Sequence, residues 1–409
     1  ILRSAQNDND RIESAQHDNR RGFWLRPKAA LRYKSAVSGM LASRTETLVK
    51  KKSLYFLFAL FIAIAPLCWA QAPMPLKLIR TIKMPQVRCQ QASLNSQQLA
   101  QAVNTERIFG IACHFDRFGL DLKHHRLFAV PEDNHTVEVY SVPSGKLLHS
   151  IGGIGMAHGV LYRPGINRIY ITDGADGLLR IYDGTSYRLL KTVKLLTDAD
   201  AIGYDPATHY LYIANGGKDA KLDYTLLSIV NTDTGEHIGD IKINGNRLEQ
   251  MALEKSGPLL FINVTDKRAV GVINRNQRAV VAMWPIQEGD INAAMALDEA
   301  DHRLFVACRS GVMNVFDMET GKVVAVLPIS KGADDMTYDP VRKRIYVPCA
   351  EGFIDVFYQR DPDHYTLLGK APSGPMGKTG ILVSSLDRYY VAVPPHGSTE
   401  AEILVYRVQ

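Results

Sequence analysis

The chain has 409 residues, 46% hydrophobic and 22% charged, which is typical of globular proteins and excludes a globally disordered chain. Its net charge of +6 comes from the start of the chain, because residues 1–70 hold 12 basic and 5 acidic residues. Residues 71–409 are left with 36 basic and 37 acidic residues, so the sequence disfavours nucleic-acid binding by the main part of the chain.

The first 39 residues show no apolar periodicity and begin with Ile1 rather than Met. Within them, segment 4–9 is echoed by segment 14–19. Met40 would be a natural start, because a leader of conventional length follows it. We therefore predict that residues 1–39 are a non-native extension, with a disordered tail as the alternative.

Residues 40–70 have the order of features of a secretory signal peptide. Lys50, Lys51 and Lys52 precede the apolar segment 53–70, which ends in small residues at cleavage spacing. This pattern predicts a periplasmic or extracellular protein with no stable membrane insertion after cleavage. The alternative is an uncleaved anchor facing the periplasm, since 18 residues border on the length that spans a bilayer.

One apolar motif recurs seven times in the remainder of the chain. Each copy has a basic or polar residue, two large apolar residues and then a run rich in β-branched residues. The central residue of each copy, called its anchor below, is Leu127, Ile169, Leu211, Leu260, Leu304, Ile345 or Tyr389. Successive anchors are separated by 42, 42, 49, 44, 41 and 44 residues, a period that indicates a repeat architecture.

Each copy carries four strand signals. An apolar stretch ends in a turn such as Asp205-Pro206, the motif follows, and a Gly- and Asp-rich loop leads to a third, alternating stretch. A Gly-containing hairpin then leads to a fourth strand, with no helical stretch between. Because one four-stranded sheet cannot bury both faces, the copies must pack radially. The sequence predicts an all-β fold over residues 71–409, a seven-bladed β-propeller of four-stranded antiparallel blades.

The two ends of the chain predict how the ring closes. The seventh copy stops after its third strand at residues 401–406 and lacks a fourth. Residues 76–82 resemble the fourth strand of another copy, at residues 146–151. We predict that this N-terminal strand completes the last blade, which would cover an exposed sheet edge. Residues 86–109, rich in Gln and Asn, are predicted to be an insertion.

Four cysteines follow the predicted leader: Cys89, Cys113, Cys308 and Cys349. An even number in an exported chain permits two disulfides with three possible connectivities. Cys308 and Cys349 occupy equivalent places in neighbouring copies, but packed sheets lie about 10 Å apart, too far for a disulfide without a bend. Buried free thiols are the equal alternative.

Segments of the repeats resemble a known family. YITD at 170–173 and YIAN at 212–215 are similar to the signature of the YVTN-repeat, YncE-like bacterial β-propellers. The turns at 231–236 and 317–322 resemble that family's turn between its third and fourth strands. The resemblance spans residues 76–409 and implies the propeller fold and export. The Gly-His and Trp-Asp marks of WD40 repeats are absent, although the repeat is WD40-like in length and strand number.

A propeller's first strands line its central channel, and alignment of these strands predicts which residues surround the entrance. The alignment uses Phe115, Tyr162, Tyr204, Leu253, Leu297, Tyr338 and Val383. One level of the entrance then contains Ile111, His158, Asp200, Glu249, Ala293, Asp334 and Thr379, with Asp335 and Gln250 one position later and Asn292 and Lys378 one earlier. The loop at 215–223 is predicted to open on the same face.

The candidate ligand-binding residues are His158, Asp200, Glu249, Asp334, Asp335 and Lys378. They are expected to form a solvated channel mouth, a site for a small ligand or hard cation, or a hydrolytic site with His158 as general base. The sequence has no HExxH, CxxCH or GxSxG motif. We predict no cofactor and no dedicated metal site.

Two functional hypotheses follow. The first is an exported, non-catalytic, monomeric protein that binds a protein, glycan or small ligand at the entrance face. The second is a lactonase-like hydrolase that uses His158 with Asp200, Glu249 or a bound divalent metal. The lack of a compact catalytic motif favours the first, and fold alone cannot decide between them.

Overall fold

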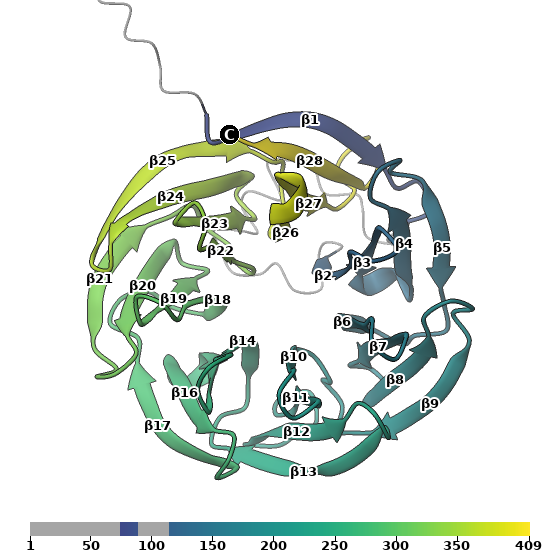
Figure 1. The fold of residues 1–409 in the computed structure, drawn as a ribbon, viewed down its shortest axis with the longest axis horizontal. Coiled ribbons are helices and arrows are strands. Elements are labelled where there is room, and N and C mark those ends of the chain that lie inside the picture. The colour runs from purple at the N-terminus through teal and green to yellow at the C-terminus, as the bar shows by residue number, and fades with distance from the viewer. Residues whose placement is uncertain (1–73, 89–113) are drawn as a thin grey trace, which may run out of the picture. The chain divides into compact units, whose positions relative to one another are not determined.

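A computed structural model describes residues 74–88 and 114–409. The predicted extension, the signal peptide, Cys89, Cys113 and most of the predicted insertion lie outside these residues. The described part contains seven four-stranded antiparallel sheets arranged in a ring, so the predicted seven-bladed β-propeller is confirmed (Figure 1). No helix within the described residues is long and apolar enough to cross a membrane.

The blades follow one another in chain order, each running from the channel outwards. Blade 1 consists of β2 (Phe115–Asp121), β3 (Arg126–Pro131), β4 (Val137–Ser141) and β5 (Leu147–Ile151). Blade 2 consists of β6 (Ala157–Arg163), β7 (Arg168–Asp173), β8 (Leu178–Asp183) and β9 (Leu189–Lys194). Blade 3 consists of β10 (Ile202–Asp205), β11 (Tyr210–Gly216), β12 (Thr225–Asn231) and β13 (Glu236–Ile243). Blade 4 consists of β14 (Leu248–Leu253), β15 (Leu259–Val264), β16 (Ala269–Asn274) and β17 (Ala279–Pro285).

The last three blades repeat this order with one exception. Blade 5 consists of β18 (Asn292–Asp298), β19 (Arg303–Cys308), β20 (Val312–Asp317) and β21 (Val323–Pro328). Blade 6 consists of β22 (Thr337–Asp339), β23 (Arg344–Cys349), β24 (Phe353–Asp361) and β25 (His364–Pro372). Blade 7 takes β26 (Thr379–Val383), β27 (Arg388–Val393) and β28 (Glu402–Val408) from the end of the chain and β1 (Leu76–Lys83) from its start.

The ring closes between β1 and β28. Leu76 pairs with Val408 and Lys83 with Glu402 in an antiparallel ladder, and the two strands lie side by side on the outside of blade 7 (Figure 1). The predicted closure by an N-terminal strand is therefore confirmed. Three short 3-10 turns, η1 (Glu132–Asn134), η2 (Thr265–Lys267) and η3 (Ser384–Leu386), complete the described secondary structure.

The hydrophobic core of the described ring lies between blades rather than inside one layer. On β3, Leu127 and Ala129 pack towards blade 7, whereas Phe128 and Val130 pack towards blade 2. Successive side chains of a strand point to opposite faces, so each anchor strand contributes to two interfaces. This explains why β3 is buried along its whole length.

Cys308 and Cys349 end β19 and β23, and both are buried free thiols. Cys308 and Cys349 are therefore the buried free thiols of the second alternative. They lie in two different hydrophobic clusters. Burial raises the pKa of the Cys308 thiol to about 12, which leaves it protonated and unreactive. The pairing of the other two cysteines falls outside the described residues.

Candidate functional site

Strand pairing defines one ring of equivalent residues at the channel entrance. In each blade, one residue of the first strand pairs with the anchor. The residue four positions before that paired residue is the blade's member of the ring. In chain order the ring contains Asp116, His158, Asp200, Glu249, Ala293, Asp334 and Lys378. The structure therefore brings together five of the six candidate residues at one level.

Two members of the ring differ from the sequence alignment. In blade 1 the anchor pairs with Leu120 rather than Phe115, which replaces Ile111 by Asp116. In blade 7 it pairs with Leu382 rather than Val383, which replaces Thr379 by Lys378. Both alignments were wrong because these two first strands were not placed seven residues before their anchors, as the other five were.

The ring residues lie where the regular ladder of each first strand is interrupted. Four of them sit in β-bulges: Asp116 between Phe115 and Phe118, His158 between Ala157 and Val160, Glu249 between Leu248 and Met251, and Ala293 between Asn292 and Ala294. Asp200, Asp334 and Lys378 lie just before their first strands begin. A bulge bends the strand and redirects a side chain, so this irregularity turns polar groups towards the channel axis.

These residues line a cavity of about 440 Å³. Its lining consists of Asp116, Glu132, Met156, His158, Asp198, Asp200, Lys218, Asp219, Asn246, Arg247, Leu248, Glu249, Arg309, Asp334 and Lys378. Lys218 and Asp219 belong to the long loop of blade 3, which opens on this cavity as expected. Asp335 is not part of the lining and instead accepts a hydrogen bond from Gln250 Nε2 at 3.0 Å.

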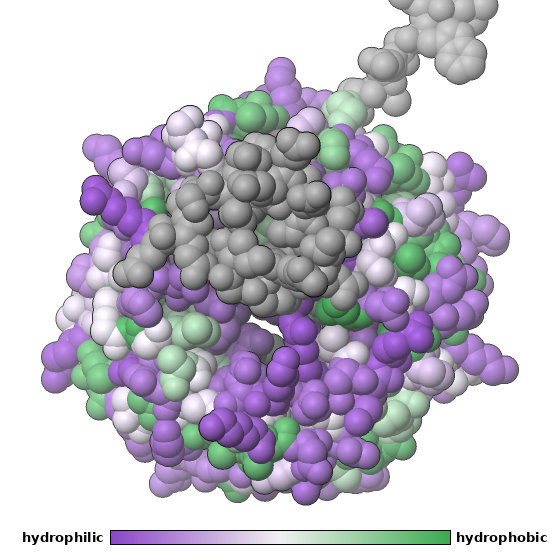
Figure 2. Space-filling model, turned by 180° about the vertical axis from the view of Figure 1, so that it is seen from behind, coloured by the Kyte–Doolittle hydropathy of each residue, from purple (hydrophilic) through white to green (hydrophobic). Residues whose placement is uncertain are grey.

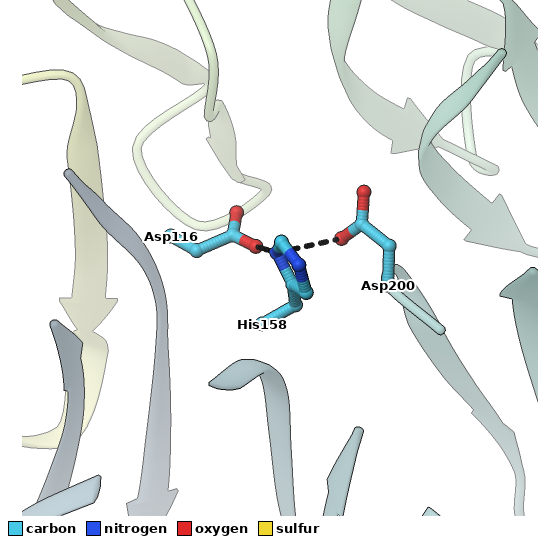
Figure 3. Close-up of side chains that lie close together, drawn as sticks. All are labelled: Asp116, His158 and Asp200. Atoms are coloured by element: carbon cyan, nitrogen blue, oxygen red, sulfur yellow. Dashed lines mark hydrogen bonds and ion pairs between the residues drawn. The ribbon is translucent and has the colours of Figure 1, made fainter. Parts of the chain in front are cut away.

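One side of the cavity, called the histidine group, contains Asp116, His158 and Asp200 (Figure 3). His158 Nδ1 lies 2.7 Å from Asp116 Oδ2 and 3.9 Å from Asp200 Oδ1. Their side chains are 12%, 10% and 18% exposed, in that order. Three neighbouring blades thus place one imidazole between two carboxylates, away from bulk water.

Close packing fixes the imidazole. A Cβ atom on Gly174 would lie 2.5 Å from His158 Nε2, so only glycine leaves room for the ring here. The Asp200 backbone is fixed on both sides, because its N–H donates to Ala214 O at 2.9 Å and its carbonyl accepts from Thr172 Oγ1 at 2.8 Å. The geometry of the histidine group is therefore set by rigid strands.

The charges of the histidine group are incompletely balanced. Burial opposes ionisation of His158, but Asp200 and Asp116 outweigh it and hold the pKa of the imidazole well above its usual range. Burial opposes ionisation of Asp116 too, yet Arg117 and the hydrogen bond from His158 lower its pKa. Burial and the neighbouring Asp116 raise the pKa of Asp200 well above its usual range. One imidazolium thus compensates Asp116 and leaves Asp200 poorly compensated.

The other side, called the arginine group, contains Glu249, Arg309, Asp334 and Lys378. Arg309 Nε donates to Asp334 Oδ1 at 2.8 Å, and its Nη2 lies 3.2 Å from Glu249 Oε1. Lys378 Nζ donates to the other oxygen of Asp334. Burial alone would favour neutral Asp334, but Arg309 and Lys378 hold its pKa well below its usual range. These charges compensate one another.

Sequence reasoning missed several charged residues of the site. Arg309 follows β19 and Glu132 lies in η1, so both come from loops between second and third strands. Arg117 follows Asp116, and its Nη1 donates to Asp334 O at 3.2 Å, which joins blade 1 to blade 6. Only loop position could have indicated Arg309 and Glu132, since loops carry no strand periodicity.

Three carboxyl groups near the cavity have pKa values above their usual range. Burial raises the pKa of Glu132 to about 7 and that of Asp198 to about 6, with nearby carboxylates contributing in both cases. Burial also raises the pKa of Asp335 to about 6, although Arg117 opposes this. The entrance therefore carries more acidic groups than its basic residues neutralise. Among the described residues, Asp116, His158 and Asp200 each offer a donor atom, and these atoms lie close enough together to hold one metal ion.

No known family profile matches the chain. The chain is 22% identical over 180 residues to the "Probable U3 small nucleolar RNA-associated protein 18" of Schizosaccharomyces pombe. This match covers 44% of this chain, and the chain spans about a third (34%) of the length of that relative.

Solved structures are similar in fold. A chain of the mitotic checkpoint complex has a TM-score of 0.63 at 12% identity, covering 91% of this chain and 99% of that one. Hydrazine synthase of Kuenenia stuttgartiensis has a TM-score of 0.62 at 14% identity, covering 73% and 97%. The WD40 repeats of RRP9 have a TM-score of 0.61 at 12% identity, covering 73% and 95%. At these identities the likeness shows the fold alone, a seven-bladed β-propeller with WD40-repeat neighbours.

Proposed function

We propose that this protein is an exported, non-catalytic β-propeller that binds a charged ligand, or a charged segment of a protein or glycan partner, at its channel entrance. One observation carries the proposal. The cavity of about 440 Å³ is lined by seven carboxylates, four Lys or Arg side chains and one His. Side chains from all seven blades converge there, and a rigid ring is a scaffold on which such a site keeps its geometry.

Several features support binding rather than catalysis. Asp200 and Asp116 hold the pKa of His158 well above its usual range, and a raised pKa does not suit the general-base role at neutral pH. The lining holds charged groups of both signs, carboxylates and Lys or Arg side chains, which suit a polar, charged ligand. Such a ligand would replace its contacts with water by contacts with these charged groups. The face in Figure 2 shows hydrophilic residues with scattered small hydrophobic patches rather than one large apolar surface, which favours polar recognition.

We also propose that the protein is exported and is a member of the YncE-like bacterial family. These two proposals rest on the signal-like segment 53–70 and on the motifs at 170–173 and 212–215. The near-neutral balance of residues 71–409 supports a protein, glycan or small-molecule partner over nucleic acid. β1 covers the edge that β28 would otherwise expose, and the inner edge strands line the channel, which supports a monomer.

Thermal unfolding of the purified protein in EDTA tests the proposal. Small carboxylates, amines, sugars and lactones would be added singly. A ligand at a hundred times its dissociation constant stabilises the folded state by about 2.7 kcal/mol and raises the melting temperature. Asp200→Asn should abolish the shift, whereas Asp361→Asn should retain it, since Asp361 forms a comparable contact with His364 outside the cavity. No shift with any class, or an equal shift in both variants, would contradict the proposal.

A lactonase-like hydrolase is the second candidate, favoured by the imidazole held between Asp116 and Asp200. With His158 protonated, this activity would need His158 as a proton donor or a metal ion to activate water. Turnover of a lactone panel by the purified protein, lost in His158→Ala, would favour this candidate. Absence of turnover with a ligand-induced thermal shift would favour binding.

A further inference from the structure

We propose that Asp116, His158 and Asp200 form a binding site for one divalent transition-metal ion of the Zn²⁺ or Mn²⁺ class. The inference rests on the proposed function, since it identifies one ligand of the same cavity. It starts from the distances between donor atoms. One ligand atom from each residue can be chosen so that all three lie within 4.8 Å of one another.

These distances match a common metal ion. Bonds from Zn²⁺ to imidazole nitrogen or carboxylate oxygen are about 2.0–2.2 Å long, so two donors to one ion lie at most about 4.4 Å apart. His158 Nδ1 is 2.7 Å from Asp116 Oδ2 and 3.9 Å from Asp200 Oδ1, within that limit. Coordination by Nδ1 would require His158 to release the proton that it donates to Asp116, because an imidazole that ligates a metal ion is neutral.

A second observation points to a missing positive partner. The buried Oδ1 atom of Asp200 accepts no hydrogen bond within the described residues. Its nearest cationic group is the imidazole at 3.9 Å, whose Nδ1–H instead donates to Asp116 at 2.7 Å. A buried carboxylate oxygen without a donor is costly, and a coordinated cation removes that cost. The arginine group, by contrast, satisfies its own carboxylates.

The backbone around the donors is rigid enough for a metal site. Asp116 and His158 lie in bulges of β2 and β6, and the Asp200 backbone is hydrogen-bonded to Ala214 and Thr172. Gly174 packs against the imidazole edge. Donors built on neighbouring strands keep their positions better than donors on loops.

The donor set indicates the class of ion. Ca²⁺ and Mg²⁺ prefer oxygen ligands alone, whereas one imidazole with two carboxylates suits Zn²⁺ and Mn²⁺. Three protein donors leave coordination positions open towards the cavity, which an anionic ligand or water can fill. Glu132 and Asp198, also in the lining, add negative charge that attracts a cation.

Isothermal titration of EDTA-treated, dialysed protein with Zn²⁺ or Mn²⁺ tests the site. We expect one ion per chain, with affinity at least tenfold weaker in Asp200→Asn and in His158→Gln. Asp361→Asn is the matched control, because Asp361 forms an equivalent contact with His364 at 2.8 Å on an exposed hairpin, where these side chains are 53% and 76% exposed. This control should bind like the wild type. Circular dichroism would establish that each variant is folded.

Co²⁺ provides a second readout, since its visible absorption reports nitrogen and oxygen coordination. A Co²⁺ spectrum that His158→Gln abolishes supports the site. Absence of binding by the wild type, or equal binding by wild type and both folded variants, overturns it. Because the ligand panel above is run in EDTA, the two experiments are independent. A thermal shift there without metal binding rejects this inference alone. Metal binding without any shift there contradicts the proposed function and leaves the metal site standing.

Discussion

The histidine group and, apart from Arg309, the arginine group occupy equivalent positions of the same ring, yet the two groups balance buried charge differently. In the arginine group, Asp334 is bound by both Arg309 and Lys378, and all of these side chains are buried. In the histidine group, two carboxylates share one imidazole. The repeat sets where a side chain lies, whereas the residue type decides whether a site is neutralised internally or attracts a ligand.

The difference also explains why the groups have separate roles. The arginine group ties blades 4, 5, 6 and 7 together at the entrance, and Arg117 adds blade 1 through the Asp334 carbonyl. Its charges are occupied with one another. The histidine group spans blades 1 to 3 and has an oxygen atom without a donor. We therefore expect substitutions in the first group to affect stability and those in the second to affect binding.

The largest effect is expected for Asp334→Ala. The substitution leaves two buried cations without their carboxylate, and breaking such a buried pair costs about 3–5 kcal/mol of unfolding free energy. Chemical denaturation measures this loss. Asp176→Ala is the control, since Asp176 pairs with Arg180 at the surface and exposed pairs contribute at most about 1 kcal/mol. A loss for Asp334→Ala as small as that of the control would contradict an internally neutralised group.

A pH profile separates two adjacent carboxylates with opposite behaviour. The pKa of Asp335 is raised from 3.8 to about 6, so the folded state retains a proton that the unfolded state releases. Stability therefore falls as pH rises through this window, by about 3 kcal/mol at 1.36 kcal/mol per pH unit. The pKa of Asp334 is lowered, so its contribution is present above the unfolded pKa and lost as pH falls through the folded one.

Asp335→Asn should remove the fall in stability as pH rises towards 6 and should keep the loss of stability at low pH that Asp334 causes. Unfolding free energies at pH 4, 5 and 6.5 would show a smaller decline in the variant than in the wild type. Parallel profiles over this range would mean that Asp335 titrates normally in the folded protein.

Gly174→Ala should have a smaller effect, which is confined to the histidine group. The added Cβ would lie 2.5 Å from His158 Nε2, and overpacking of this kind typically costs about 1–3 kcal/mol. Gly165→Ala is the matched control, because a Cβ there meets no heavy atom within 4 Å. Denaturation should show a loss for Gly174→Ala alone, together with weaker Zn²⁺ binding. Equal stability of the two variants would mean that the imidazole is not fixed by packing.

The fold could be predicted from the sequence because the anchor motif repeats and its period is long enough for four strands. Closure by residues 76–82 followed from the missing fourth strand of the last copy, and the pairing of β1 with β28 confirms it. A repeat of this kind specifies local structure and neighbour packing together, so sequence patterns and the observed topology agree.

The site was less predictable, for reasons that lie in particular residues. Asp116 was missed because the first strand of blade 1 was aligned five residues too early, on Phe115 instead of Leu120. Counting back from the anchor Leu127, as in the other blades, would have found it. Arg309 and Glu132 lie in loops, where side-chain direction depends on tertiary packing and no periodicity marks it. The compensation of Asp334 by Arg309 follows only from the three-dimensional structure.

Anomalous diffraction from a crystal of the protein grown with Mn²⁺ tests the central claim most directly. The claim is that the histidine group is the part of the entrance cavity that attracts a cation, whereas the arginine group is neutralised internally. The account predicts one anomalous peak at bonding distance from Asp116, His158 Nδ1 and Asp200 Oδ1, and none beside Asp334. A peak beside Asp334 or Glu249, or no peak in the cavity, would contradict it.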